Sequence, residues 1–103
     1  MTRLPTVAVL LGLCLIPVAA HAQGDAANGH VLARHWCTGC HVVEAGGSGS
    51  DTAPSFAAIA SDAATTPQRL RAFLVRPHPP MPNPPLATSE IDDIAAYILT
   101  LRK

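Results

Sequence analysis

A chain of 103 residues with 10 prolines and 7 glycines has room for one compact domain at most. Seven basic side chains balance seven acidic ones, which excludes a nucleic-acid binder, since such a protein would show a basic patch. The hydrophobic residues, 49% of the chain, are rich in alanine, and only 4% of the chain is aromatic. A domain this small is rarely stable without a staple, a metal or a cofactor, so something large and apolar is expected at its centre.

Residues 1–22 have the layout of a secretory signal peptide. Arg3 supplies a basic start, residues 7–20 form an apolar run, and Ala20-His21-Ala22 is a small-x-small cleavage site. The run is shorter than the ~18–20 residues that a membrane-spanning helix needs, which favours cleavage over an uncleaved anchor. We therefore expect residues 23–103 to be exported to the periplasm as the mature domain, with one net negative charge after the loss of Arg3.

The mature part shows helical periodicity, without strand alternation or an internal repeat, and this predicts an all-α fold. A first helix is expected from a cap at Asp25 to Trp36, directly before two cysteines. A loop rich in glycine and serine follows over residues 45–52. One or two helical turns are expected next, over residues 55–60.

Two further helices are predicted in the second half of the chain. Thr66 as N-cap and Pro67 at the first helical position begin one helix, which ends at Pro77. The last helix begins near Thr88 or Ser89, with acidic residues at its positive end and basic residues at its negative end. Periodicity places two sets of side chains on core-facing sides: Leu70, Phe73 and Leu74 in the third helix, and Ile91, Ile94, Ala95 and Ile98 in the last.

The strongest chemical signal is the pattern CxxCH at residues 37–41. On a helical turn, residues i, i+3 and i+4 share a face. The sulfurs of Cys37 and Cys40 can therefore meet the two vinyl groups along one haem edge while the His41 imidazole turns under the iron. The pattern predicts one covalently attached haem c, held through two thioethers, with His41 as an axial iron ligand.

Two other interpretations of the cysteines are less consistent with the sequence. A Cys37–Cys40 disulfide, structural or redox-active, suits an oxidising compartment, but the redox motif normally occurs in a βαβ setting that this sequence lacks. Structural zinc needs four ligands, usually in two closely spaced pairs, and a second pair is missing here. His30 and His78 would join such a site only by coincidence.

A proline-rich segment, residues 76–85, carries the candidate for the second axial ligand. Met81 is the one methionine of the mature part, and the surrounding prolines keep this segment extended and stiff. Its thioether is the predicted ligand opposite His41, and such ligation raises the reduction potential. His78 stays open as a rival that would give a bis-histidine site of lower potential. Trp36 is expected to pack on the haem or in the core rather than to relay electrons.

On these residues, the mature part resembles a class I cytochrome c, and more closely the small monohaem cytochromes of the Gram-negative periplasm. The positions that match are Gly29, Cys37, Cys40 and His41 at the first helix, Ile94, Tyr97 and Leu101 in the last helix, Pro54, and Met81-Pro82. The resemblance implies that Gly29 and Tyr97 lie where the terminal helices cross, and that the Pro54 carbonyl accepts a hydrogen bond from His41. Ala33 departs from the family's frequent aromatic residue at its position.

The resemblance also implies a fold of three to five helices around one haem, and a function as a periplasmic shuttle of single electrons rather than an enzyme. Its partners would be a redox donor and acceptor, such as a periplasmic dehydrogenase, a membrane cytochrome complex or an oxidase. Nucleic acid and stable membrane insertion are not expected. Two alternatives stay open: a gas- or peroxide-reactive iron if Met81 does not bind, and a fixed electron-accepting subunit of a dehydrogenase.

Overall fold

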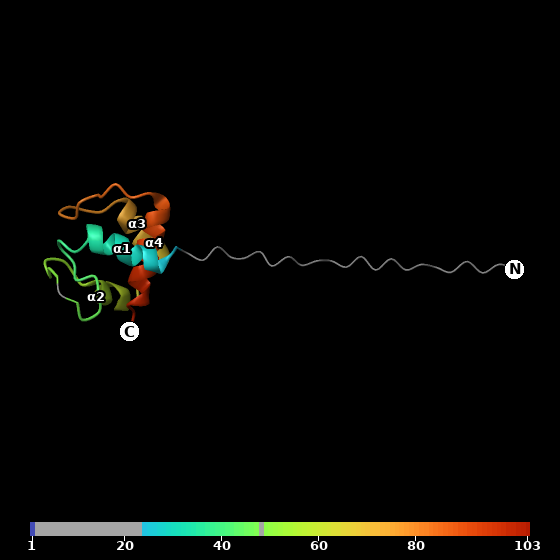
Figure 1. The fold of residues 1–103 in the computed structure, drawn as a ribbon, viewed down its shortest axis with the longest axis horizontal. Helices are drawn as coiled ribbons and strands as arrows, with labels where there is room; N and C mark the ends of the chain where they lie inside the picture. The colour runs from blue at the N-terminus through green and yellow to red at the C-terminus, as the bar shows by residue number, and fades with distance from the viewer. Residues whose placement is uncertain (2–23, 48) are drawn as a thin grey trace.

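The computed structural model describes Met1 and residues 24–47 and 49–103 of the chain. The regular structure in these residues is α-helical, as predicted, and comprises α1 (Ala26–Trp36), α2 (Phe56–Ser61), α3 (Pro67–Val75) and α4 (Thr88–Thr100) (Figure 1). The predicted signal peptide and its cleavage site lie outside the described residues. Within the described part, none of the helices combines the length and hydropathy that crossing a membrane requires.

The helix starts are set by local side-chain caps. The Asp25 carboxylate accepts hydrogen bonds from the first backbone N–H groups of α1, and the Thr66 hydroxyl accepts one from Arg69 N in α3. Both caps agree with the sequence prediction. In α4 the cap is different, because the Glu90 carboxylate reaches back to the N–H of Ala87 at 2.9 Å. These caps satisfy N–H groups that a helix leaves without partners.

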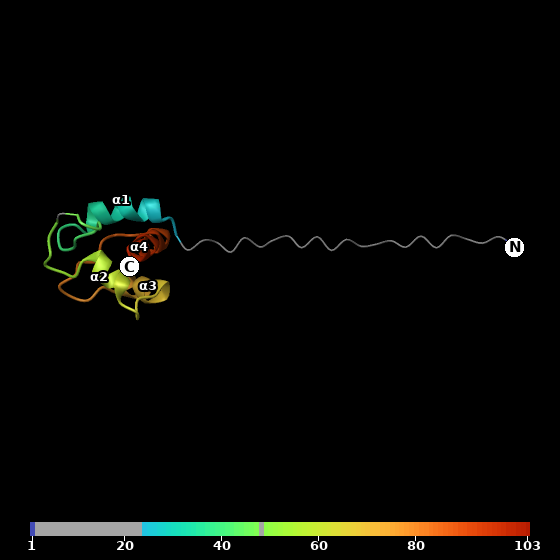
Figure 2. The same cartoon turned by 90° about the horizontal axis from the view of Figure 1, so that it is seen from below.

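Helix α4 is the centre of the fold, since it packs against each of the other three helices. In Figure 2, α1 lies on one side of α4, and α2 and α3 lie on the other. Ile94 is fully buried at this centre. The predicted core face of α4 is confirmed, and the residues that bury it come from all four helices and one loop: Ala33, Val43, Phe56, Ala60, Leu70, Ile91, Ile94, Ala95, Tyr97 and Ile98.

Helix α1 crosses α4 so closely that one position of α1 has no room for a side chain. A Cβ atom on Gly29 would lie 1.9 Å from the backbone oxygen of Asp93, so only glycine fits. The Asp93 carboxylate ties the same crossing, accepting hydrogen bonds from Asp25 N at 2.6 Å and Asn28 Nδ2 at 2.7 Å. Gly29 therefore lies where the resemblance placed it, and the small Ala33 is fully buried one turn further along.

Two aromatic residues are exposed, and one of them, Phe73, differs from the sequence expectation. Phe73 is 42% exposed, although Leu70 and Leu74 on the same helix pack inward. Successive helical residues are rotated by about 100°, so Leu70 and Leu74 face α4 together and Phe73 falls at the edge of that face. Trp36 is 40% exposed, and its ring meets His35 edge-on. Trp36 thus lies outside the buried core, and its packing on the haem stays a prediction.

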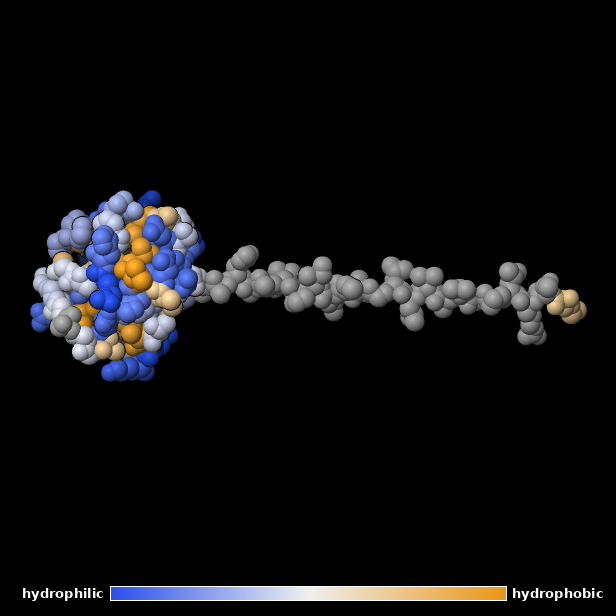
Figure 3. All heavy atoms as spheres, viewed as in Figure 1, coloured by the Kyte–Doolittle hydropathy of each residue, from blue (hydrophilic) through white to orange (hydrophobic). Residues whose placement is uncertain are grey.

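Apolar side chains also reach the surface. Figure 3 shows them on one face of the molecule as patches between hydrophilic residues. Among residues 24–47 and 49–103, the large apolar residues that are exposed are Val31, Trp36, Phe73 and Val75.

Candidate functional site

The three residues of the CxxCH pattern are brought together by the end of α1. Cys37 caps the helix, and its N–H donates to the Ala33 carbonyl at 2.9 Å. The chain then keeps turning, because the Cys37 carbonyl accepts from both Cys40 N (3.2 Å) and His41 N (3.0 Å). No disulfide joins the two cysteines, of which Cys37 is half-buried and Cys40 exposed. Two thiols and an imidazole thus occupy one continuous turn.

The chemistry of this turn disfavours the two alternative interpretations. Burial raises the pKa of the Cys37 thiol to about 11, whereas a thioredoxin-like cysteine needs a lowered pKa so that the reactive thiolate forms. In the described part of the chain, no three His, Cys, Asp or Glu side chains gather in a group that could hold a metal ion. A redox disulfide and a structural zinc site both lack support from this geometry.

The His41 side chain is oriented by one hydrogen bond. Its Nδ1 lies 2.6 Å from the carbonyl oxygen of Pro54, and since a carbonyl only accepts, Nδ1 must carry the proton and donate it. The other ring nitrogen, Nε2, then keeps a free lone pair in the neutral imidazole. The buried Phe56 ring packs beside the imidazole, with centroids 5.2 Å apart. The hydrogen bond is the one that the resemblance implied for Pro54.

The loop that carries His41 is held by hydrogen bonds on two sides. The carbonyls of Cys40 and Val42 accept from the N–H groups of Ala53 (2.8 Å) and Phe56 (3.0 Å), which flank Pro54. The Val43 carbonyl accepts from the Tyr97 hydroxyl of α4 at 2.6 Å. Burial is the main factor that raises the pKa of Tyr97, so its hydroxyl stays a donor at neutral pH.

Removing this hydroxyl tests its contribution to stability. Tyr97→Phe keeps the ring but leaves the carbonyl of the buried Val43 without its donor. We expect a loss of about 1–3 kcal/mol in the free energy of unfolding, the usual penalty for an unsatisfied buried polar group. Urea unfolding measures it as a lower midpoint with an unchanged slope. Ser50→Ala is the control, because the bonds of its hydroxyl to Thr52 are exposed and water can replace them; equal losses in both variants would contradict the expectation.

Met81 comes from a separate part of the chain, the proline-rich strap that joins α3 to α4 (residues 76–87). In Figures 1 and 2 this strap lies at the same end of the molecule as the segment that follows α1. Met81 is half-buried, and its N–H donates to the His78 carbonyl at 2.9 Å in a turn. Leu86 anchors the far end of the strap against the core.

His78, the rival ligand, has a different environment. Its side chain is exposed, and its ring meets the Phe73 ring edge-on with centroids 4.9 Å apart. Sequence reasoning missed this contact, because it followed from the rotation of Phe73 away from the core. The imidazole is therefore packed against α3.

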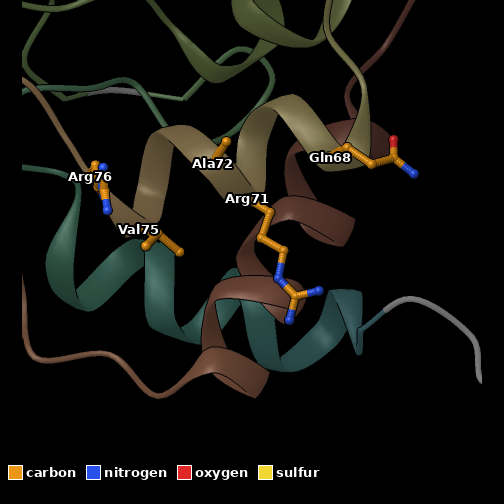
Figure 4. A pocket seen from close by; sticks show the side chains of 5 residues that line it. All are labelled: Gln68, Arg71, Ala72, Val75 and Arg76. Carbon is orange, nitrogen blue, oxygen red and sulfur yellow. The ribbon is translucent and has the colours of Figure 1, made fainter.

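A hollow of about 450 Å³ lies elsewhere, along α3 (Figure 4). Arg71 points from it toward α4, where it pairs with Asp92 at 3.2 Å. None of the predicted site residues borders this hollow, which is lined by Gln68, Arg71, Ala72, Val75 and Arg76. It is separate from the candidate site.

Sequence reasoning also missed a polar cluster beside the His41 loop. His30 on α1 stacks on Tyr97 of α4, with centroids 4.7 Å apart and planes 21° apart. Its Nε2 lies 2.7 Å from the Glu44 carboxylate, which also pairs with Arg34 Nε at 3.5 Å. Fourteen residues separate His30 from Glu44, so no local spacing in the sequence announces this contact.

Comparison with known proteins defines the class. The sequence model of the cytochrome c family matches residues 26–102. The chain therefore belongs to this family. Its fold is accordingly the all-α cytochrome c fold, and it binds a covalently attached haem c with its iron. Haem-based electron transfer is the general function of such a protein.

A particular relative is the cytochrome c-552 of Bradyrhizobium diazoefficiens. It is 42% identical to this chain over 99 residues, which cover 90% of the chain and 95% of the relative. No solved structure matches the chain.

Proposed function

We propose that this chain is an exported periplasmic carrier of single electrons, and that it does not act as an enzyme on its own. In this proposal Cys37 and Cys40 would hold the haem, and His41 and Met81 would ligate its iron. The carrier takes electrons from one redox protein and delivers them to another, such as a periplasmic dehydrogenase and a membrane cytochrome complex or oxidase. Export rests on the signal-peptide pattern of residues 1–22.

The observation that carries the proposal is the hydrogen bond from His41 Nδ1 to the Pro54 carbonyl. A histidine that ligates a metal usually donates its other ring N–H to such an acceptor, which fixes the tautomer and raises the basicity of the ligating nitrogen. Here that bond leaves the lone pair of Nε2 available to a metal, on the same turn as the two cysteine side chains. The donor set of two thiols and one oriented imidazole fits an attached haem.

Each residue of the site has a separate task. Bound haem supplies one-electron chemistry, in which the iron alternates between ferrous and ferric states. Cys37 and Cys40 fix the position of the group through covalent bonds, and Pro54 orients His41. The buried Phe56 ring beside the imidazole keeps water from that side.

The proposal for Met81 rests on the strap. Its six prolines restrict the backbone, so a side chain is presented at a low entropic cost. Met81 is half-buried, whereas His78 is exposed and already packed against Phe73. These environments favour the thioether over the imidazole as the second ligand. Two protein ligands would close the iron to substrates, which suits an electron carrier.

Exchanging the two candidate ligands tests the function. We expect the oxidised wild type to show the weak absorption band of sulfur-to-iron charge transfer at the edge of the near infrared, and not to bind carbon monoxide readily. Met81→Ala should remove the band, lower the reduction potential and open the iron to carbon monoxide. His78→Ala is the matched control from the same strap and should leave all three properties nearly unchanged.

Two results would contradict parts of this proposal. If His78→Ala disturbs the spectrum and Met81→Ala does not, the second ligand is histidine. If the wild type binds carbon monoxide readily, a gas- or peroxide-reactive protein replaces the carrier. Fractionation of the native host tests export, because the mature chain should appear in the periplasm beginning near Gln23. Stable copurification with a dehydrogenase after mild extraction would indicate a fixed subunit instead of a diffusing carrier.

A further inference from the structure

The polar cluster around Glu44 joins three separate elements next to the proposed iron ligand. His30 belongs to α1, Glu44 lies three residues after His41, and Tyr97 belongs to α4. The imidazole of His30 contacts the other two at once, by its stack on the Tyr97 ring and its 2.7 Å bond to the Glu44 carboxylate. The same Tyr97 donates its hydroxyl to the carbonyl of Val43. Two consecutive residues of the His41 loop are thus held by one stacked pair of side chains.

We propose that His30, Glu44 and Tyr97 form a clasp that positions the loop carrying His41, and that opening this clasp raises the reduction potential of the haem protein. The proposal rests on the proposed function, in which His41 binds the iron. In these terms His30 and Glu44 are positioning residues, because they act on the iron only through the loop.

The clasp is linked to His41 through consecutive backbone contacts. The carbonyls of Cys40 and Val42 bond to the N–H groups of Ala53 and Phe56, on either side of Pro54. Val43 and Glu44 continue this short run. The Val43 side chain is buried in the core and its carbonyl bonds to Tyr97 of α4, whereas Glu44 is tied to α1 by its contact with His30. Releasing Glu44 loosens one end of the run that keeps Pro54 beside His41 Nδ1.

The direction of the expected change follows from ligand chemistry. The bond from Nδ1 to Pro54 makes the imidazole a more basic donor, and a more basic donor favours the ferric state. Loosening the loop weakens that bond, so the ferrous state becomes more stable relative to the ferric state and the reduction potential rises. The clasp therefore keeps the potential lower than it would be with a free loop.

The groups that face the Glu44 carboxylate determine the direction of its pKa shift. The Glu44 carboxylate faces His30 and Arg34 of α1 and, across the stack, Tyr97 of α4. The hydrogen bond from His30, followed by the charge of Arg34, lowers the pKa of Glu44 from its ordinary value of 4.5. A lowered carboxyl pKa adds stability above pH 4.5, and this contribution is lost as the pH falls through the lowered value. The effect of the clasp is therefore present at neutral pH.

The test measures the potential of the intact haem protein in a double-mutant cycle of His30→Phe and Glu44→Gln. Phenylalanine keeps a ring to stack on Tyr97 but cannot bond Glu44. At about pH 9, where histidine is ordinarily neutral, His30→Phe removes a hydrogen bond without changing a charge. We expect the ratio of reduced to oxidised protein at a fixed solution potential to rise roughly two- to tenfold in each variant, the range of one hydrogen bond. Because both variants open the same clasp, the ratio in the double variant should be little higher than in either single variant.

A second readout follows the loop itself. Hydrogen exchange at the Ala53 and Phe56 amides should become about tenfold faster in both variants, because these N–H groups hold the His41 loop. Matched controls are Asp51→Asn, an exposed carboxylate on the same connecting segment, and His35→Phe, an exposed histidine on α1. Both controls should leave the potential and the exchange rates close to those of the wild type.

The proposal is overturned if the variants lose stability while the potential stays constant, which would make the clasp purely structural. Additive effects in the double variant, or a shift as large in Asp51→Asn, would also overturn it, because they would show independent charge effects. Failure of the proposed function has a different signature, an iron spectrum that does not respond to His41→Ala. If the clasp has no influence on the reduction potential, the iron spectrum still responds to His41→Ala.

Discussion

Replacing Cys37 and Cys40 together by serine is expected to abolish covalent haem and most of the folded structure with it. Serine has the shape of cysteine but forms no thioether, so the group would have no bond to the chain. A core of this size, assembled from short helices and many alanines, supplies little stability by itself. A single small core rarely gives more than ~3–5 kcal/mol, so losing the buried surface of the haem should leave the chain largely unfolded.

Haem staining of a denaturing gel and circular dichroism measure the two parts of this prediction separately. Thr38→Ala is the control within the same pentapeptide, because it keeps both thiols and His41 and removes only a hydroxyl bond to Arg34 O. It should stain like the wild type. Persistent staining of the double variant would rule out attachment at these cysteines. Native helix content with a cooperative melt would show instead that the chain folds without the haem.

Gly29→Ala should cause the second large effect, a loss of about 2–4 kcal/mol in the free energy of unfolding. The new Cβ would lie 1.9 Å from the backbone oxygen of Asp93, and a backbone atom cannot rotate away. The helices must separate, which typically costs about 1–3 kcal/mol or somewhat more in a packed core. Alanine returns ~1 kcal/mol through its better helix propensity, but the separation also strains both bonds of the Asp93 carboxylate.

Thermal unfolding of the haem protein measures this effect, and a domain of this size should melt roughly 10–30 °C lower. Val31→Ala is the control on α1, because Val31 is exposed and the change meets no clash. It should shift stability by less than about 0.5 kcal/mol. A Gly29→Ala protein that melts with the wild type would mean that the terminal helices do not cross as closely as the structure has them.

Local patterns accounted for most of the secondary structure. Asp25, Thr66 and Pro67 predicted the starts of two helices because caps act over two or three residues. The core face of α4 followed from its apolar period for a similar reason. Phe73 is an exception, because an apolar period identifies one side of a helix without saying how much of that side the neighbouring helices cover.

In the candidate site, too, residues close in sequence were predicted from the sequence and distant contacts were not. Cys37, Cys40 and His41 lie within five residues, and one helical turn is enough to bring them together. Met81 was singled out by composition, and its role stays a prediction. The bond from His41 to Pro54 came from the family resemblance, since thirteen residues separate the two. The contact of His30 with Glu44 was not predicted at all.

By itself, therefore, the sequence determined the all-α class, the helix starts and the haem-attachment motif, each of which depends on neighbours within about one turn of helix. Tertiary structure alone decided which aromatic residues are covered, how closely Gly29 approaches Asp93, and that His30 meets Glu44 and Tyr97. These contacts join residues that are distant in the chain, and they depend on the angle and depth at which α1 and α4 cross. That angle depends on the whole packed core, in which every side chain restricts the others, so it cannot be predicted from a short segment of sequence.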